Sequence, residues 1–382
     1  MGTEEYTEEE IYYEIFMGFR GFGYACAARL IRLRGSLREA FYLPEKMLER
    51  ALPKKLAQEI RQCSEDWLRR FGSPYGIEEW RKEELSKLYH NGIYFSSCAS
   101  PDFPKRLLSI QDIPLGLYYK GKLLAEETPS ISIIGARACS NYGVRMAMDF
   151  AKAFANAGVC VVSGMARGID GIAQRSALQA GGISVGVLGC GVDVCYPVGN
   201  RDVFEALPLS GGLVSEYPPG TEPRGMHFPR RNRIISALGD ALLVVEARNK
   251  SGTLITVDMA LDQGKEVYVL PGRVTDPLSA GCNRLIKQGA SLVESPEELL
   301  AELGYKASAL KRPKQPVFQD AAEKIIWETM DDEPKSAKEA AIALERGGIS
   351  MEHRDLMLKL SHMVMDGYLE QPLPGFFAKS LP

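Results

Sequence analysis

The 382-residue sequence lacks the excess of positive charge that would by itself indicate a nucleic-acid-binding protein. It has 46 lysines and arginines against 49 aspartates and glutamates, so the formal net charge at pH 7 is −3. Any binding of nucleic acid must therefore come from a local basic patch. The sequence also lacks an apolar run near the roughly 18 residues that a membrane-spanning helix needs. Its acidic beginning has no signal-peptide pattern.

Cysteine and histidine are present, but not with the spacing of a metal site. The eight cysteines include no C-x-x-C pair, and the four histidines do not supply the missing ligands. A structural zinc site normally needs closely spaced ligand pairs. The sequence therefore predicts no metal ion. Together with the missing membrane and signal segments, this cysteine usage indicates a cytoplasmic protein with reduced thiols.

The chain is long enough for two or three domains of about 150 residues each. Hydrophobic residues make up 45% and charged residues 25%, the usual balance of a globular protein. Residues 1–75 alternate charged and apolar positions at helical spacing and predict a small helical domain. Gly21-Phe22-Gly23 interrupts this pattern. It is compatible with a helix-hairpin-helix, whose backbone amides can meet phosphate, or with the commoner tight corner of a helical bundle.

Residues 76–304 are predicted to form the central domain. Their first part, 76–128, is rich in turn residues. From 130 onward, short β-branched runs alternate with helical segments: ISIIG, VCVVSG, ISVGVLG, GLVSE, ALLVVE, EVYVLPG and SLVES. Continuous apolar strands separated by helices are typical of a parallel sheet covered on both faces. The sequence therefore predicts an α/β fold with a doubly wound parallel sheet.

Residues 305–317 carry lysine, arginine and proline without periodicity, and predict a linker. Within 318–382, three short helical patterns are followed by two strands around a turn, which suggests a winged-helix domain. Its candidate recognition helix, 351–365, is not convincingly basic, and its apolar positions favour contact with protein over reading of a DNA duplex. The charged residues of that helix are His353, Arg354 and Lys359 beside Glu352 and Asp355.

Basic residues gather in the loops that follow the predicted strands of the central domain. In an open parallel sheet, ligands bind beyond the carboxyl ends of the strands. Three of these loops are glycine-bearing turns that lead into helices, where free amides and the helix dipole favour an anion. Arginine also donates in pairs to phosphate. The cations are Arg137, Arg167, Arg201, Arg224, Arg230, Arg231, Arg233, Arg248 and Lys250.

The same loops carry aromatic residues that could stack on bases: Tyr142, Tyr196, Tyr217 and Phe228. Several phosphate cradles beside aromatic rings match a strand of nucleic acid better than a single nucleotide. A purely structural explanation is that the glycines permit tight turns and the arginines pair with carboxylates. For any single loop, phosphate binding and a purely structural role are about equally supported. For several such turns at one sheet edge, the binding explanation is favoured. The available carboxylates are Asp170, Asp193, Glu216 and Glu246.

The same loops also bear on enzymatic alternatives. Gly135-Ala136-Arg137 fails the G-x-G-x-x-G pattern of dinucleotide enzymes, and there is no GxxxxGK[ST] phosphate loop. Neither a cofactor nor a catalytic residue is therefore predicted. A second hypothesis remains open. Asp170, Glu216 and Glu246 at adjacent strand ends could polarise water or ribose, as in a phosphoribohydrolase-like enzyme that hydrolyses nucleotide N-glycosidic bonds.

The ordered motifs resemble the DNA-processing protein A family, also called DprA or Smf. They cover most of residues 90–300. Because so many motifs occur in the same order, the similarity is not a matter of chance. The matching stretches are Ile134–Arg137 with Tyr142-Gly143, Ser163–Asp170, Cys190–Asp193 with Tyr196-Pro197, Ser215–Pro218, Phe228-Pro229 with Arg231–Arg233, Glu246-Ala247, Ser251–Thr256 and Leu270–Gly272.

The resemblance implies an extended Rossmann-like core, with a sterile-alpha-motif-like helical domain before it and a winged helix after it. It implies a homodimer without enzymatic activity that binds single-stranded DNA, protects incoming strands in natural transformation and loads RecA recombinase. One departure is Ala136, where many members carry serine, so one possible hydroxyl donor to phosphate is missing. The residues implied to bind DNA are Gly135, Arg137, Ser163, Gly164, Arg167, Arg224, Phe228, Arg230, Arg231, Asn232, Arg233, Lys250, Ser251 and Gly252.

Overall fold

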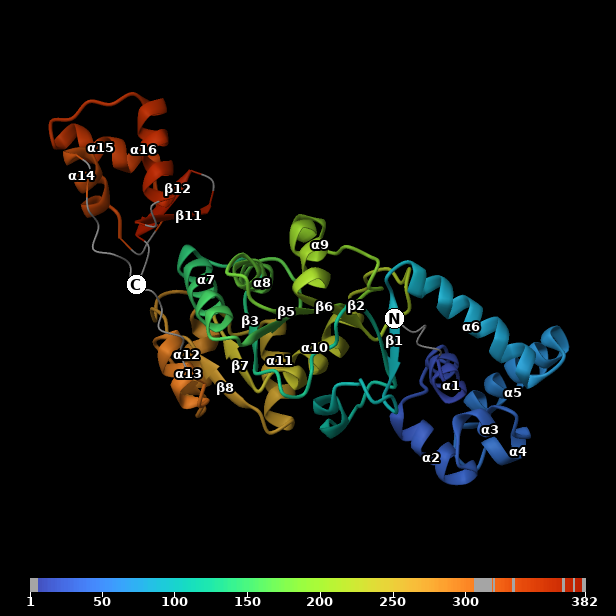
Figure 1. Cartoon of the computed structure of the whole chain (residues 1–382). Coiled ribbons are helices and arrows are strands. Elements are labelled where there is room, and N and C mark those ends of the chain that lie inside the picture. The colour runs from blue at the N-terminus through green and yellow to red at the C-terminus, as the bar shows by residue number, and fades with distance from the viewer. Residues whose placement is uncertain are drawn as a thin grey trace.

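A computed structural model of the chain describes residues 6–305, 318, 320–331, 334–365, 368–373 and 375–379. Figure 1 shows three regions in chain order: N-terminal helices, a central sheet with helices around it, and C-terminal helices with a small sheet. The predicted linker at 305–317 lies outside the described residues, except for Tyr305.

The N-terminal region contains six helices. The first begins at a capping box, in which the Thr7 hydroxyl accepts from the Glu10 amide and the Glu10 carboxylate accepts from the Thr7 amide. Phe22, in the turn predicted as a hairpin or corner, is buried and packs with its ring 4.5 Å from that of Phe16. The helices are α1 (Glu8–Met17), α2 (Tyr24–Arg34), α3 (Leu37–Phe41), α4 (Glu45–Leu48), α5 (Lys54–Phe71) and α6 (Pro74–His90).

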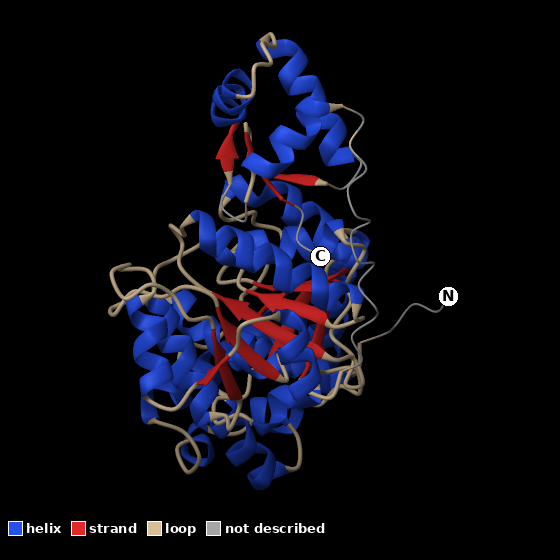
Figure 2. Ribbon diagram, turned by 90° about the vertical axis from the view of Figure 1, so that its left-hand side faces the viewer, coloured by secondary structure: helices blue, strands red, loops and turns tan. Residues whose placement is uncertain are grey.

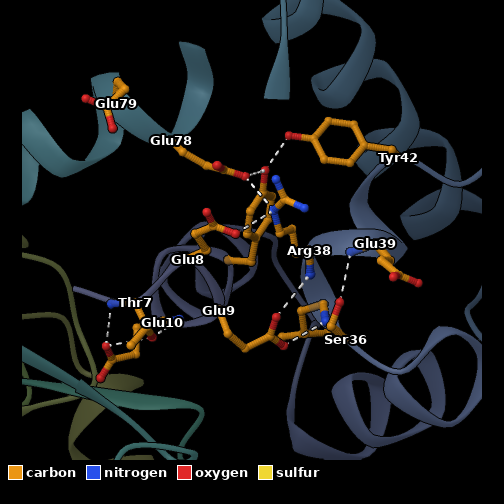
Figure 3. A network of polar contacts seen from close by, with 12 residues as sticks. Thr7, Glu8, Glu9, Glu10, Ser36, Arg38, Glu39, Tyr42, Glu78 and Glu79 are labelled. Carbon is orange, nitrogen blue, oxygen red and sulfur yellow. Dashed lines mark hydrogen bonds and ion pairs between the residues drawn. The ribbon is translucent and has the colours of Figure 1, made fainter. Parts of the chain in front are cut away.

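Buried and half-buried charges join α1, α3 and α6 (Figure 3). Glu78 is 1% exposed, and it accepts hydrogen bonds from Arg38 Nε at 2.7 Å and from the Tyr12 hydroxyl at 3.1 Å. Glu9 accepts from the backbone amides of Leu37 and Arg38, at the start of α3. A buried carboxylate needs such donors, because losing its hydration is costly. The network therefore holds the three helices in one arrangement.

Helix α6 crosses the domain boundary predicted at residue 75. Ile77 and Leu85 are buried in the same hydrophobic core as α1, and Arg81 Nε donates to Glu14 at 2.6 Å. The expectation of a turn-rich stretch from residue 76 is therefore wrong for residues 76–90. The physical reason is that α6 buries only a narrow face, so its charged residues conceal the helical period.

The central region is a nine-stranded sheet in the order β1-β2-β6-β5-β4-β3-β7-β8-β9. Strands β3 to β9 run parallel to one another, whereas β2 pairs antiparallel with both β1 and β6. The strands are β1 (Tyr94–Ser97), β2 (Gly116–Gly121), β3 (Ser130–Ile134), β4 (Cys160–Ser163), β5 (Ser184–Val187), β6 (Gly211–Ser215), β7 (Ala241–Val244), β8 (Glu266–Val269) and β9 (Ser291–Leu292).

Helices cover both faces of this sheet (Figure 2). Val161 packs into the core beneath α7 and α8, and its neighbour Val162 packs into the opposite core beneath α10 and α11. The predicted doubly wound α/β fold is confirmed. Its helices are α7 (Asn141–Asn156), α8 (Ile169–Gln179), α9 (Arg201–Ser210), α10 (His227–Leu238), α11 (Gly252–Asp262), α12 (Ala280–Lys287) and α13 (Pro296–Glu302), with short 3₁₀ segments at Lys105–Ser109 and Val198–Asn200.

Among its described residues, the C-terminal region has three helices and a three-stranded sheet in the order β10-β12-β11. The sheet has one strand more than the two that the sequence pattern suggested. The additional strand, β10, is only two residues long and is therefore too short to show a pattern in the sequence. This region contacts α7, where Glu370 of β11 pairs with Arg145 and Lys152. The elements are α14 (Ala321–Thr329), β10 (Lys335–Ser336), α15 (Ala337–Arg346), α16 (His353–Met365), β11 (Leu369–Leu373) and β12 (Phe376–Lys379).

Candidate nucleic-acid interface

A cleft of about 670 Å³ opens at the carboxyl ends of the central strands. Strand β3 lies between β4 and β7, so the chain order reverses at this point of the sheet. Loops after parallel strands diverge where the order reverses, and they leave a crevice there. The cleft is lined by the loop after β3, the beginning of α8, the first turns of α10 and the loop that leads from β7 into α11.

The first turns of three helices face this cleft: α8, α10 and α11. Among the described residues, no side chain accepts a hydrogen bond from the first backbone amides of any of these three helices. Uncapped amides and the positive end of the helix dipole attract an anion. The loops also approach one another closely. A Cβ on Gly168, whose φ is +73°, would lie 2.3 Å from the carbonyl oxygen of Ala136, so glycine is required there.

Arg137 is exposed at the site, and Phe228 beside it is half-buried. The Arg137 guanidinium carbon lies 5.8 Å from the centre of the Phe228 ring, and the Tyr196 ring lies 5.5 Å from the same ring. Arg248 lines the cleft as well. Neither Arg137 nor Arg248 forms an ion pair with any residue that the structure describes. Two cations and two aromatic rings are thus available to a ligand.

Arg231 also lines the cleft, but its side chain is almost entirely buried. The residue is 5% exposed, and its Nη1 donates to the carbonyl oxygens of Gly164, at 2.7 Å, and Val187. Burial lowers the pKa of Arg231 to about 10, while the nearby Asp170 charge opposes that shift. The guanidinium therefore stays charged at neutral pH. A Cβ on Gly164 would lie 2.8 Å from Nη2 of Arg231, so this glycine gives the buried cation its room.

Two predicted residues belong to the fold and not to the cleft. The Ser163 hydroxyl is buried and donates to the carbonyl oxygen of Ile133 at 2.6 Å. Arg233 is 6% exposed and pairs with Glu216 at 2.6 Å and with Asp112 at 3.0 Å. Positions 231 and 233 of one helix are about 200° apart around its axis, so they cannot serve the same surface. Ser163 and Arg233 were both predicted to bind DNA, but the structure places both in the fold and neither in the lining of the cleft.

The remaining predicted residues fall into two groups. Asn232 lines the cleft together with Gly135, Ser251 and Gly252. Four cations lie outside the lining of the cleft and are exposed: Arg167, Arg224, Arg230 and Lys250. Arg230 has a distant partner, Glu216, at 3.8 Å.

The structure adds lining residues that did not enter the predicted site. Thr253 follows the predicted Ser251-Gly252 turn, and its hydroxyl donates to the carbonyl oxygen of Gly135 at 3.2 Å. This bond ties the loop after β7 to the loop after β3. The Ser-Gly-Thr sequence could have identified Thr253 as a lining residue. Pro223 and Gly225 also line the cleft, and the sequence around them carries no comparable signal.

The carboxylates named for the hydrolase hypothesis are occupied by the fold. Glu246 is 1% exposed and accepts from the amide of Ser140 at 3.0 Å and from its hydroxyl. Glu216 is held by Arg233. Only Asp170 lines the cleft, and burial raises the pKa of its carboxyl.

Three further properties bear on the chemistry of the chain. All eight cysteines are free thiols. Within the described ranges, no group of three or more histidine, cysteine, aspartate or glutamate side chains is placed to hold a metal ion. No helix in the same ranges is both long and apolar enough to cross a membrane.

Comparison with protein families finds a match to the model for DNA recombination-mediator protein A over residues 95–304. The Smf protein of Escherichia coli is 45% identical over 204 residues, which are 53% of this chain and 54% of that protein. The DNA processing protein DprA of Streptococcus pneumoniae is 41% identical over 203 residues, 53% of this chain and 72% of that protein. The alignment thus spans about half the length of the E. coli relative.

Two solved structures are also similar. The crystal structure of DprA from S. pneumoniae aligns with a TM-score of 0.58 and 31% identity, over 79% of this chain and 99% of that one. A structure that describes the single-stranded DNA binding mode of DprA from Helicobacter pylori aligns with a TM-score of 0.51 and 30% identity. That alignment covers 56% of this chain and 97% of the H. pylori chain.

Proposed function

Because the chain belongs to the DNA recombination-mediator protein A family, we propose that it binds single-stranded DNA in the cleft at the carboxyl ends of β3, β4 and β7. One observation carries the proposal. Three uncapped helix N-termini, two unpaired arginines and two aromatic rings meet in a single cleft. The H. pylori relative, whose structure concerns single-stranded DNA, supports the same ligand.

The parts of the cleft have different tasks in this proposal. Arg137 grips a phosphate in front, and the positive ends of α8, α10 and α11, which no described side chain caps, attract others. Arg231 adds positive charge from below without touching DNA. A base stacks against the Tyr196–Phe228 pair, an interaction of about 1 to 3 kcal/mol per base. A single strand can present its bases to these rings, whereas a duplex keeps its bases inside.

In the wider role, the protein protects incoming single strands and loads RecA recombinase during natural transformation and recombination. It does so as a homodimer in the cytoplasm and without catalysing a reaction. The DprA relatives support this role by their names, DNA processing proteins. The engagement of Glu216 and Glu246 by the fold favours binding over N-glycoside hydrolysis.

The C-terminal winged helix contacts protein rather than duplex DNA. Lys359 is a cation of its candidate recognition helix, α16, and it is already paired with Asp320 at 2.6 Å and with Glu323 at 3.4 Å. A lysine held by two carboxylates is poorly placed to neutralise a phosphate. This pairing supports the interpretation made from the mixed charge of the helix.

The test is fluorescence anisotropy of a labelled oligo-dT and of a matched duplex across a salt series. The variant Arg137→Ala is compared with wild type and with Arg50→Ala, which removes an exposed cation from the turn after α4. We expect tighter, salt-sensitive binding of the single strand. Arg137→Ala should weaken it for all sequences and lower the salt slope by about one.

Equal binding of duplex and single strand would contradict the proposal, and so would identical losses for Arg137→Ala and Arg50→Ala. A parallel incubation with nucleoside monophosphates tests the alternative. Free base released in proportion to protein, and lost in Asp170→Asn, would favour N-glycoside hydrolysis.

A further inference from the structure

A second cavity, of about 290 Å³, lies between the N-terminal helices and the antiparallel edge of the central sheet. Its walls come from Tyr6, two residues before α1, from α1 and α6, and from β1, β2 and the turn after β1. Strands β6 and β5 separate β2 from β4, so this cavity is distinct from the proposed DNA cleft. Its size is near the lower end, about 300 Å³, of small-molecule sites.

Aromatic rings form most of the wall. Tyr94 and Tyr119 are directly opposite each other in the β1–β2 pairing, and their rings lie 5.2 Å apart at 28°. The Tyr89 ring, at the end of α6, meets Tyr94 edge-on at 5.2 Å and 88°. The Tyr6 hydroxyl accepts from the Phe95 amide at 3.3 Å, which places a fourth tyrosine at the cavity. Tyr94 and Tyr119 cover one face of each other, so a ligand meets the remaining ring faces, which carry negative electrostatic potential.

Two carboxylates complete the lining, and neutral donors hold both. Glu10 accepts from the amide and hydroxyl of Thr7, each at 2.8 Å, and from the Ser100 hydroxyl. Asp102 accepts from the Ser96 hydroxyl at 2.7 Å. Among the residues for which the structure gives positions, no lysine, arginine or histidine pairs with either carboxylate. The cavity therefore has two negative charges with no cation of the chain to balance them.

We propose that this cavity binds an organic cation of the ammonium or guanidinium type. Such a cation satisfies the two carboxylates and gains cation–π attraction from the tyrosine rings. An anion would be repelled, and a neutral apolar molecule would desolvate the carboxylates without compensation. A bare metal ion is disfavoured because no cluster of three ligands is found among the described side chains. The cation is either a free small molecule or a lysine or arginine side chain of a protein partner.

The position of the cavity gives its occupant a structural consequence. Glu10 and Tyr89 belong to the N-terminal helices, whereas Tyr94, Tyr119 and Asp102 belong to the central region. A bound cation contacts both regions at once. Binding therefore stabilises their present arrangement in proportion to ligand concentration and affinity.

The test is isothermal titration calorimetry of the full chain with four probes. Choline and N-acetyl-arginine amide are free cations, acetyl-Ala-Arg-Ala-amide presents the cation on a peptide, and 3,3-dimethylbutan-1-ol is the neutral isostere of choline. We expect saturable one-to-one binding of the cations and no saturable binding of the alcohol. Asp102→Asn and Tyr94→Leu should each weaken cation binding roughly fivefold or more.

Matched controls are Asp262→Asn and Tyr75→Leu, which make the same changes at exposed positions away from the cavity. Both should bind as wild type does. Unchanged thermal unfolding and oligo-dT binding of Asp102→Asn and Tyr94→Leu show that the variants are folded. This readout also separates the inference from the proposed DNA function, which uses other residues.

Each result either identifies the source of the cation or overturns the proposal. Peptide binding at least tenfold tighter than N-acetyl-arginine amide would identify a protein side chain as the ligand. Equal affinities would identify a free small cation. Equal binding of choline and its neutral isostere would overturn the proposal, as would cation affinities that do not change in Asp102→Asn and Tyr94→Leu. Absence of saturable binding by every cation would overturn it as well.

Discussion

Arginines that are close in the sequence, or that lie near the same cleft, have different structural roles in this molecule. Arg137 is exposed and lies over the Phe228 ring. Arg231 is buried and donates to backbone carbonyl oxygens. Arg233 is buried in an ion pair with Glu216. Residue type therefore identifies a basic region, but only burial and partners separate ligand contacts from structural cations.

Arg233→Met tests this distinction at one residue. The change leaves Glu216 without its 2.6 Å partner in a buried site, and removing one member of a buried pair typically costs about 3 to 5 kcal/mol. We expect the urea midpoint to fall accordingly, while the folded protein keeps its affinity for oligo-dT. Arg233→Met combined with Glu216→Gln should recover part of the loss, because the unpaired charge is gone.

Arg137→Ala is the control for the same experiment. Its side chain is exposed and has no ion-pair partner among the described residues, so its free energy of unfolding should change by less than about 0.5 kcal/mol. If Arg233→Met instead weakened DNA binding at unchanged stability, its assignment as a structural residue would be wrong.

At the scale of elements, four helices begin near the cleft, and three of them, α8, α10 and α11, have no side-chain cap among the described residues. The beginning of α7 is closed by the chain itself. Ser140 accepts from the Gly143 amide at 3.1 Å, and its own amide and hydroxyl donate to Glu246, which follows β7. A Cβ on Gly143 would lie 2.3 Å from a Glu246 oxygen. Glu246 thus occupies the anion position of α7, which the helix dipole favours.

Ser140→Ala tests this closure against an ordinary helix cap. Ser295 also caps a helix, α13, and accepts from the Glu298 amide at 3.2 Å. Loss of a serine cap typically costs about 1 kcal/mol. Ser140→Ala also removes a hydroxyl donor from a buried carboxylate, a bond of about 1.5 to 3 kcal/mol. We therefore expect chemical denaturation to show a clearly larger loss for Ser140→Ala than for Ser295→Ala. Equal losses would mean that Glu246 does not depend on the serine.

At the scale of the whole molecule, α7 also carries the contact with the C-terminal region (Figure 1). Glu370 of β11 pairs with Arg145, which is 1% exposed, and with Lys152 at 3.0 Å. Asp149 accepts from Arg145 Nε at 2.9 Å on the same helix. Burial raises the pKa of Asp149 to about 6, an effect that Arg145 opposes and the Glu370 charge reinforces.

This raised pKa predicts a pH dependence of stability. The ordinary value is 3.8, so folding favours the protonated form of Asp149. Its contribution is fully present below about pH 3.8 and is lost as the pH rises through about 6. Between pH 7.5 and pH 5, wild type should therefore gain about 1 kcal/mol relative to Asp149→Asn, whose amide does not titrate.

Urea unfolding at the two pH values measures that difference. Asp258→Asn, at an exposed position of α11, is the control and should follow wild type. The comparison between variants removes the contribution of all other titrating groups. Parallel pH profiles for wild type and Asp149→Asn would contradict the buried position of this carboxyl.

Much of the architecture was predictable because it depends on near neighbours in the chain. The run ALLVV, 241–245, is apolar at five successive positions, which is typical of strands covered on both faces. The glycine-bearing turns after them place basic loops at one sheet edge. Gly135, Arg137 and Phe228 could be assigned to the cleft on that basis. Helix α6 and the two-residue β10 could not, because the first hides its period among charges and the second is too short to show one.

The sequence alone determined the doubly wound α/β core, the sheet edge that carries the basic loops and the membership of the family. These follow from local periodicity, turn chemistry and motif order. Only the tertiary structure decided which cations face the cleft. Arg231 reaches Gly164 across 67 positions, and Ser140 meets Glu246 across 106. Such partners are chosen by packing between distant segments, because burial makes an unpaired charge too costly to leave alone.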